Sequence, residues 1–122
     1  MNTAELRRLL ELAAKAVGYG THHGTNSVRM LLSTPVVALV VHDADGRLIS
    51  TGWNPADDDG ESRQLEVALF LTVAVRRHEI EVFDEHGYCL CSIPVDTEND
   101  DLAAATRLAV LKAAAEIGRS ME

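Results

Sequence analysis

The densest group of side chains able to do chemistry is a run of carboxylates that follows the only tryptophan. In order, the segment holds Trp53, Asn54, Pro55, Asp57, Asp58, Asp59, Gly60 and Glu61. Carboxylate oxygens are the ligands that Mg²⁺ and Ca²⁺ prefer, but the run lacks the spaced aspartates and the distal glutamate of a calcium loop. We favour the alternative that Asp58 or Asp59 caps a helix and stabilises its positive end.

The same segment could serve a partner protein. Tryptophan is enriched at the energetic centres of interfaces, so Trp53 is either an interface anchor or a plug beside the rigid Asn54-Pro55 turn. An exposed indole would favour the first reading. The candidate partner-binding residues are Trp53, Asp57, Asp58, Asp59 and Glu61.

Histidines offer a weaker alternative. His22 and His23 are adjacent on an expected loop and could join His42 or Asp43 around a metal ion. No helical or cysteine–histidine ligand spacing supports such a site, so a solvated loop is the favoured interpretation. We expect no bound metal.

The two cysteines, Cys89 and Cys91, lie two residues apart on an expected strand. Neither a disulfide framework nor a Cys-x-x-Cys redox pair fits this spacing, and we favour plain packing over a shared metal. No P-loop, no Gly-x-Gly-x-x-Gly and no Gly-x-Ser-x-Gly occurs. With no nucleophile–base pair in view, we expect no catalytic residues, no cofactor and a protein that is not an enzyme.

Charge and composition narrow the possible partners. The chain of 122 residues carries 11 basic and 19 acidic side chains, a formal net charge of −8. This balance argues against direct nucleic-acid binding and favours a basic partner, although it also simply keeps a small protein soluble. With 47% hydrophobic residues, the chain is expected to fold as one domain over 1–122.

We expect a cytoplasmic protein. The longest apolar run, Val36 to Val41, is far shorter than the ~20 residues of a membrane helix. Arg7 and Arg8 are followed by no long apolar region, so we expect no signal peptide and no membrane partner.

The periodicities predict the elements that must position these residues. Helices are expected over Thr3–Val17, with Thr3 as N-cap, from about Glu61 to Val75, and over Leu102–Ile117, capped by Asp100 or Asp101 and ended by Gly118. Strands are expected over Val36–His42 and Arg47–Trp53, joined as a hairpin by a turn at Asp43–Gly46, and over Glu79–Phe83 and Tyr88–Val95, joined as a second hairpin by a turn at Asp84–Gly87. Ser27–Ser33 could add another strand, separated from the next by Pro35. The expected class is α/β (α+β): a three-layer α/β/α sandwich, order α-β-β-α-β-β-α, with a mostly antiparallel sheet of four or five strands and three helices.

Three segments resemble small phage and prophage proteins of the phage ABA-sandwich type. They run from Glu11 to Gly18, from Trp53 through Asp58-Asp59-Gly60, and from Ala104 to Gly118. The resemblance implies an α/β sandwich and a phage or prophage source, and it implies no catalytic residues.

The preferred hypothesis is a phage accessory protein that binds a host or phage protein, in one form by presenting an acidic surface to a host defence complex. That form predicts one face carrying Asp57, Asp58, Asp59, Glu61, Asp96, Glu98, Asp100 and Asp101. The alternatives are a domain that binds a small molecule or nucleotide and a self-associating structural domain. Two apolar faces on the last helix favour a homodimer, unless small alanines there tolerate exposure.

Overall fold

The computed structural model describes residues 2–21, 27–31 and 34–122. Its helices are α1 (Thr3–Ala16), α2 (Asp59–Ala68) and α3 (Leu102–Ser120). Its strands are β1 (Gly20–Thr21), β2 (Ser27–Leu31), β3 (Thr34–His42), β4 (Leu48–Trp53), β5 (Thr72–Val75), β6 (Glu79–Phe83) and β7 (Cys89–Pro94). The expected α+β class is confirmed.

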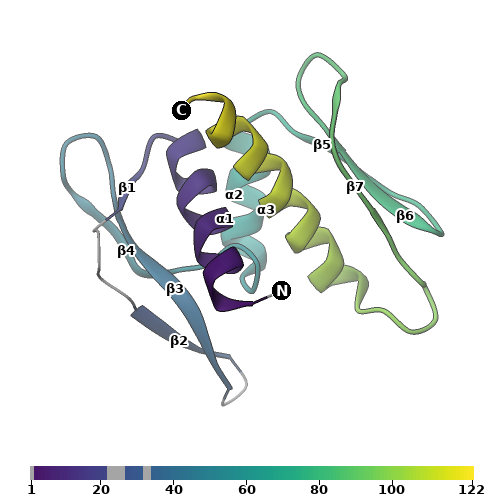
Figure 1. Ribbon diagram of the computed structural model, residues 1–122, viewed down its shortest axis with the longest axis horizontal. Coiled ribbons are helices and arrows are strands. Elements are labelled where there is room, and N and C mark those ends of the chain that lie inside the picture. Colours follow the sequence, from purple (N-terminus) through teal and green to yellow (C-terminus); the bar gives the residue numbers. More distant parts are fainter. Residues whose placement is uncertain (1, 22–26, 32–33) are drawn as a thin grey trace.

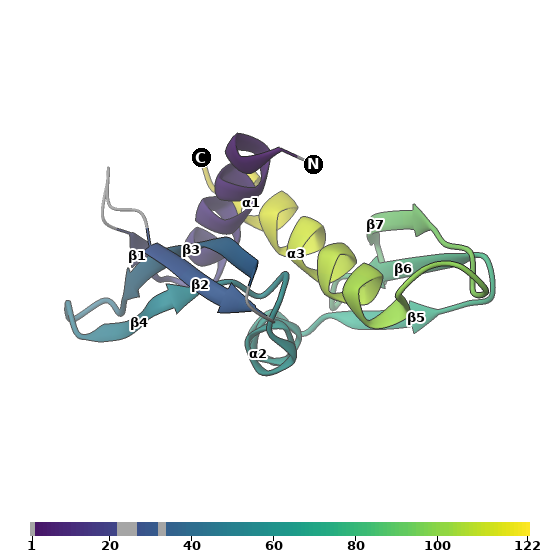
Figure 2. The same ribbon diagram turned by 90° about the horizontal axis from the view of Figure 1, so that it is seen from below.

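The layers are arranged differently from the expected α/β/α sandwich. The strands form two antiparallel sheets, and the helices lie between them (Figures 1 and 2). Within the described residues β4 pairs only with β3, and β5 pairs only with β6, so the two hairpins never join into one sheet. The predicted single sheet of four or five strands was therefore wrong. Each sheet covers its own side of the helical layer, β3 packing on α1 and β6 and β7 packing on α3.

The first sheet is built around β3, which pairs antiparallel with β1, β2 and β4. The open question of residues 27–33 is settled for Ser27–Leu31, which pair with β3, whereas residues 32 and 33 lie outside the described part. Two separate strands occur where Pro35 was predicted to divide two extended pieces. Pro35 itself does not lie between them but near the start of β3, opposite Met30. The predicted hairpin of β3 and β4 is confirmed.

The second sheet has the order β5-β6-β7 and confirms the hairpin predicted for its last two strands. Both hairpins close through the same chemistry. Asp43 Oδ1 accepts hydrogen bonds from two backbone amides of the β3–β4 turn, at 2.9 Å each, and Asp84 Oδ1 does the same in the β6–β7 turn. Gly46 and Gly87 end the two turns with φ of 82° and 86°, a conformation that glycine adopts without steric cost.

The second helix is shorter than predicted. Its last residue is Ala68, and the segment expected to continue as helix to Val75 forms β5 instead. The reversal occurs at Phe70, whose φ is 54°, while the amide of Leu71 donates to the carbonyl of Glu66 at 2.9 Å. This six-residue closure is the Schellman arrangement, after which β-branched residues of β5 pair with β6.

The core is centred on the contact between α1 and α3, which we call the α1–α3 seam. At its narrowest point Gly118 lies so close to Leu12 that a Cβ there would stand 1.9 Å from the Leu12 carbonyl oxygen. Gly118 was predicted to end the helix. It lies within α3 instead, and the helix runs on to Ser120. Small buried side chains of both helices belong to the core around the seam, namely Ala13, Ala14, Ala113 and Ala114.

The two apolar faces of α3 are both covered within the chain, by α1 and by β6 and β7. The apolar pattern of this helix therefore gives no reason to expect a second subunit. Two predicted helix starts were close to the observed ones: Asp101 caps α3, as one of two predicted candidates, whereas Asn2 rather than Thr3 caps α1.

Candidate functional site

Asn54 ties the segment after the tryptophan to its surroundings. It is buried, with 1% of its surface exposed. Its Nδ2 donates to the Val37 carbonyl at 2.5 Å, and its Oδ1 accepts from the amide of Ala56 at 2.8 Å. Its own amide donates to Glu61 Oε1 at 2.8 Å. The side chain and the amide of Asn54 together therefore join β3, the turn and the first turn of α2 in a network that we call the Asn54 junction.

The carboxylates of the run have structural partners. Asp58 is the N-cap of α2, its Oδ1 accepting from the Glu61 amide at 2.8 Å, which matches the capping role favoured from the sequence. Asp59 Oδ1 lies 2.7 Å from Arg107 Nη1 of α3, and the Nε of the same arginine donates to the Ala56 carbonyl at 3.0 Å. Among the described residues no group of three or more histidine, cysteine, aspartate or glutamate side chains could hold a metal ion.

Trp53 is buried, with 2% of its surface exposed. Its ring meets Tyr19 edge to face, with centroids 6.0 Å apart and planes at 77°. The indole packs between the first sheet and α2, near Leu65. Because it is buried, it is not available to a partner.

A groove lies between α2 and α3, and we call it the α2–α3 groove. It encloses about 460 Å³ and is lined by α2 between Asp59 and Glu66, by Val75 of β5 and by the first turns of α3. The Asp59 side chain, 83% exposed, stands on one wall. Leu102 on the other wall directly follows Asp101, the α3 cap. Arg63 and Arg107 also line the groove, so its two carboxylates, Asp59 and Glu66, each lie beside an arginine.

The loop that enters α3 is organised by Asp96. Its Oδ2 accepts from Asn99 Nδ2 at 2.6 Å, and its Oδ1 accepts from the amide of Glu98 at 3.0 Å. These two hydrogen bonds, that of the Asn99 side chain first, lower the pKa of the Asp96 carboxyl. Asp100 accepts from the Asp96 amide at 2.7 Å, so part of this acidic segment holds its own loop in shape.

The histidine and cysteine candidates are not brought into one site. His22 and His23 lie outside the described residues. The His42 ring covers Gly20 across the strands, where a Cβ would stand 2.1 Å from its Cε1 atom, and its Nδ1 lies 3.1 Å from the Asp43 carbonyl oxygen. Cys89 is exposed and donates to the Cys91 carbonyl at 3.4 Å. Burial, above all, raises the pKa of the Cys91 thiol.

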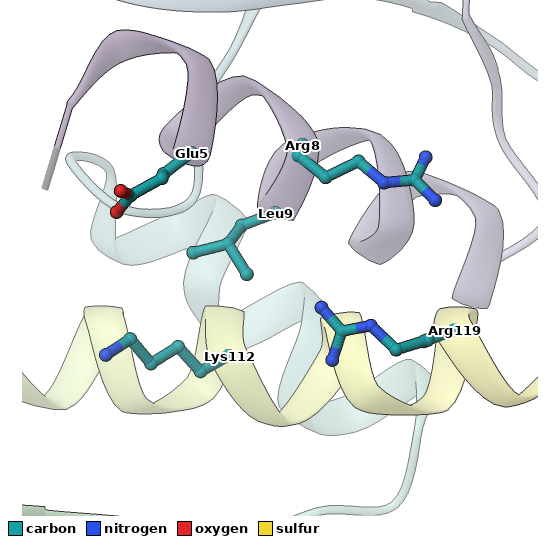
Figure 3. Close-up of a pocket in the computed structure, with 5 residues that line it drawn as sticks. All are labelled: Glu5, Arg8, Leu9, Lys112 and Arg119. Carbon is teal, nitrogen blue, oxygen red and sulfur yellow. The ribbon is translucent and has the colours of Figure 1, made fainter.

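A second groove, between α1 and α3, is lined by more cations than acids. This α1–α3 groove encloses about 500 Å³ and is lined by Glu5, Arg8, Leu9, Lys112 and Arg119. Figure 3 shows Leu9 pointing from α1 toward α3, with Lys112 to one side and the two arginines to the other. Sequence reasoning did not find this group, because its members are separated by about a hundred positions and only the pairing of the two helices joins them.

No protein-family model, curated protein or solved structure matches this chain. Within the described residues no helix is both long and apolar enough to cross a membrane. What the protein does is therefore inferred from its own residues.

Proposed function

We propose that this protein acts by binding another protein, and that the partner presents a basic, partly apolar surface to the α2–α3 groove. One observation carries the proposal: the carboxylates of Asp59 and Glu66 line a groove that also exposes Val75, each beside an arginine of the same groove, Arg107 and Arg63. The net charge of −8 attracts a basic surface and speeds its approach, the groove carboxylates can exchange their arginines for cations of the partner, and an exposed apolar side chain gives the complex a contact that excludes water.

The biological setting is part of the same proposal. The resemblance of three segments to phage ABA-sandwich proteins supports an accessory role in a phage or prophage, in the cytoplasm of the bacterial host. A protein of net charge −8 can compete for a basic channel that normally receives nucleic acid, so we propose a host defence complex as the partner. Trp53, Asp58 and Glu61 serve this surface indirectly, since they hold the start of α2 in place.

The test is affinity capture from a bacterial host lysate with two variants of equal charge. The groove variant is Asp59→Asn with Glu66→Gln. The control is Asp45→Asn with Glu85→Gln, two exposed acids in the turns of the hairpins. Both lose two negative charges, so only position distinguishes them.

We expect a protein partner that wild type and the control variant retain and that the groove variant loses. Retention by the groove variant would contradict the proposed surface, and loss from both variants would show that net charge alone is responsible. Capture of nothing above the tag alone would count against protein binding as the function. Thermal unfolding of each variant checks that α2 is still folded.

Self-association is a second candidate, and Phe70 is the observation that favours it. Phe70 is 68% exposed although it follows a helix end, and the neighbouring Val67 is 61% exposed. A second copy that covers both side chains would bury an apolar surface. Sedimentation velocity would show a concentration-dependent dimer that Phe70→Asn abolishes; a monomer across the concentration range would exclude this candidate.

A further inference from the structure

The α1–α3 groove gathers positive charge in a protein that is strongly acidic overall. Arg8 comes from α1, and Lys112 and Arg119 come from α3, and all three line one hollow. Like charges that face one another across a groove repel, and carboxylates or a bound anion can offset this repulsion. The packing of the two helices at the seam places the three cations on one groove.

The carboxylates around the groove only partly neutralise these cations. Arg8 Nη2 lies 2.6 Å from Glu122 Oε1, and its Nη1 lies 3.9 Å from Glu11. Arg119 pairs with Glu116. All of these side chains are at least 39% exposed, and exposed ion pairs contribute little because water and salt screen them. A ligand that offers stronger hydrogen bonds can therefore displace them at small cost.

The shape and chemistry of the hollow select the class of ligand. Two guanidinium groups supply planar pairs of N–H donors, which match the oxygens of a phosphate group, and Lys112 adds a point charge. Leu9 provides an apolar surface between the arginines and the lysine. A volume of about 500 Å³ lies within the range of ligand pockets and exceeds what one phosphate group fills.

The acidic surroundings select against a long polyanion. Glu5 lines the groove, and Glu11, Glu116 and Glu122 pair with its arginines. A nucleic-acid strand would have to pass all of these carboxylates with its neighbouring phosphates, whereas a single terminal phosphate displaces only those paired with the two arginines.

We propose that the α1–α3 groove binds the phosphate group of a small phosphorylated molecule through Arg8 and Arg119, with the body of that molecule resting on Leu9 on the side of Lys112. The proposal does not depend on the protein-binding function, because it uses a different surface. The shared chemistry is a phosphate group, and inorganic phosphate and a phosphorylated metabolite are separated by the experiment.

The experiment is an NMR titration of the full chain with four probes: inorganic phosphate, adenosine 5′-monophosphate, uncharged adenosine and a single-stranded oligonucleotide. We expect saturable shifts of amides in α1 and α3 with the first two probes, and tighter binding of the monophosphate because its body reaches Leu9. Adenosine and the oligonucleotide should leave these amides unchanged. Raising the salt concentration should weaken phosphate binding.

Variants separate the charge from the apolar surface. Arg8→Gln and Arg119→Gln should each raise the Kd for both phosphate probes about tenfold, as expected for a lost charge-assisted hydrogen bond. Arg47→Gln and Arg77→Gln, which remove the same charge from exposed positions elsewhere, should bind like wild type. Leu9→Ala should weaken the monophosphate and leave inorganic phosphate unchanged.

Several outcomes would overturn the proposal. No saturable shift in α1 or α3 with either phosphate probe at ~10 mM would exclude the site, since a weaker Kd has no use as recognition. Equal losses in the groove and control arginine variants would show a general charge effect. Equal binding of phosphate and the monophosphate would retain the phosphate contacts and remove the role given to Leu9.

Discussion

The α1–α3 seam and the Asn54 junction both hold helices in place, by opposite means. In the seam, Gly118 brings the backbones of two helices together and small alanines fill the rest. At the junction, Asn54 and Arg107 connect β3, α2 and α3 through hydrogen bonds to backbone carbonyls. The seam therefore requires that position 118 has no side chain, whereas the junction requires particular polar atoms.

The two grooves beside these contacts also differ. The α1–α3 groove is lined by three cations, Arg8, Lys112 and Arg119, and by one acid, Glu5. The α2–α3 groove is lined by two acids and by the arginines that pair with them, Asp59 with Arg107 and Glu66 with Arg63. The charges that line the second groove are therefore matched, whereas cations are in excess in the first.

The largest expected effect comes from adding one carbon to the seam. Gly118→Ala places a Cβ 1.9 Å from the Leu12 carbonyl oxygen, so the helices must separate. We expect a loss of about 3 kcal/mol in the free energy of unfolding, measured by denaturant titration. Gly46→Ala is the control, because nothing lies within 4 Å of its Cβ and only its φ of 82° is unfavourable. Its cost should be about 1 kcal/mol, and equal losses would contradict close packing as the cause.

The next largest effect comes from removing polar atoms at the junction. Asn54→Ala removes the donor to the Val37 carbonyl and the acceptor for the Ala56 amide, and it leaves both groups without those partners in a buried place. We expect a loss of about 2 kcal/mol. Asn2→Ala removes an exposed helix cap instead, and should cost only about 1 kcal/mol. A loss at position 54 no larger than at position 2 would show that the junction is not a main source of stability.

A gain is expected at the far end of α2. Phe70 adopts a φ of 54° that suits glycine, and its side chain is 68% exposed, so little packing would be lost on its removal. Phe70→Gly should raise the free energy of unfolding by up to about 1 kcal/mol. Phe70→Ala, which keeps the unfavourable backbone, should give no gain. Destabilisation by glycine would show that the aromatic ring makes contacts that its exposure conceals.

Local chemistry was predictable along the chain, and long-range pairing was not. The two Asp-x-x-Gly turns, both hairpins and the cap at Asp58 follow from neighbouring residues and were predicted correctly. The extent of α2 was not, because the run from Leu65 to Val75 suits a buried helix as well as a buried strand, and pairing with β6 decides between them. The prediction of a single sheet was wrong for the same reason, since no local pattern shows that β4 and β5 lie in different sheets.

The candidate site follows the same division. The sequence singled out Trp53 and the aspartates, whose types attract attention, and the structure shows Trp53 in the core and Asp58 as a helix cap. The basic groove was invisible, because Arg8 and Arg119 become neighbours only when α1 packs on α3. A glycine at position 118 inside an alanine-rich helix was the one available signal, since such a residue often marks a close approach of another backbone.

The smallest expected effect is a pH dependence of stability that comes from the loop entering α3. Hydrogen bonds from Asn99 and Glu98 lower the pKa of Asp96 below its ordinary value of 3.8, so its carboxylate stabilises the loop into α3 above that pH. The contribution is lost as the pH falls through the lowered pKa. Asp96→Asn should therefore be slightly less stable than wild type near neutral pH and equal to it in strong acid. Gly118→Ala should keep its penalty across the same range, because the seam around it is apolar. Thermal unfolding of both variants from pH 7 to acid would test this, and a pH-independent difference at Asp96 would show that its hydrogen bonds do not require the charge.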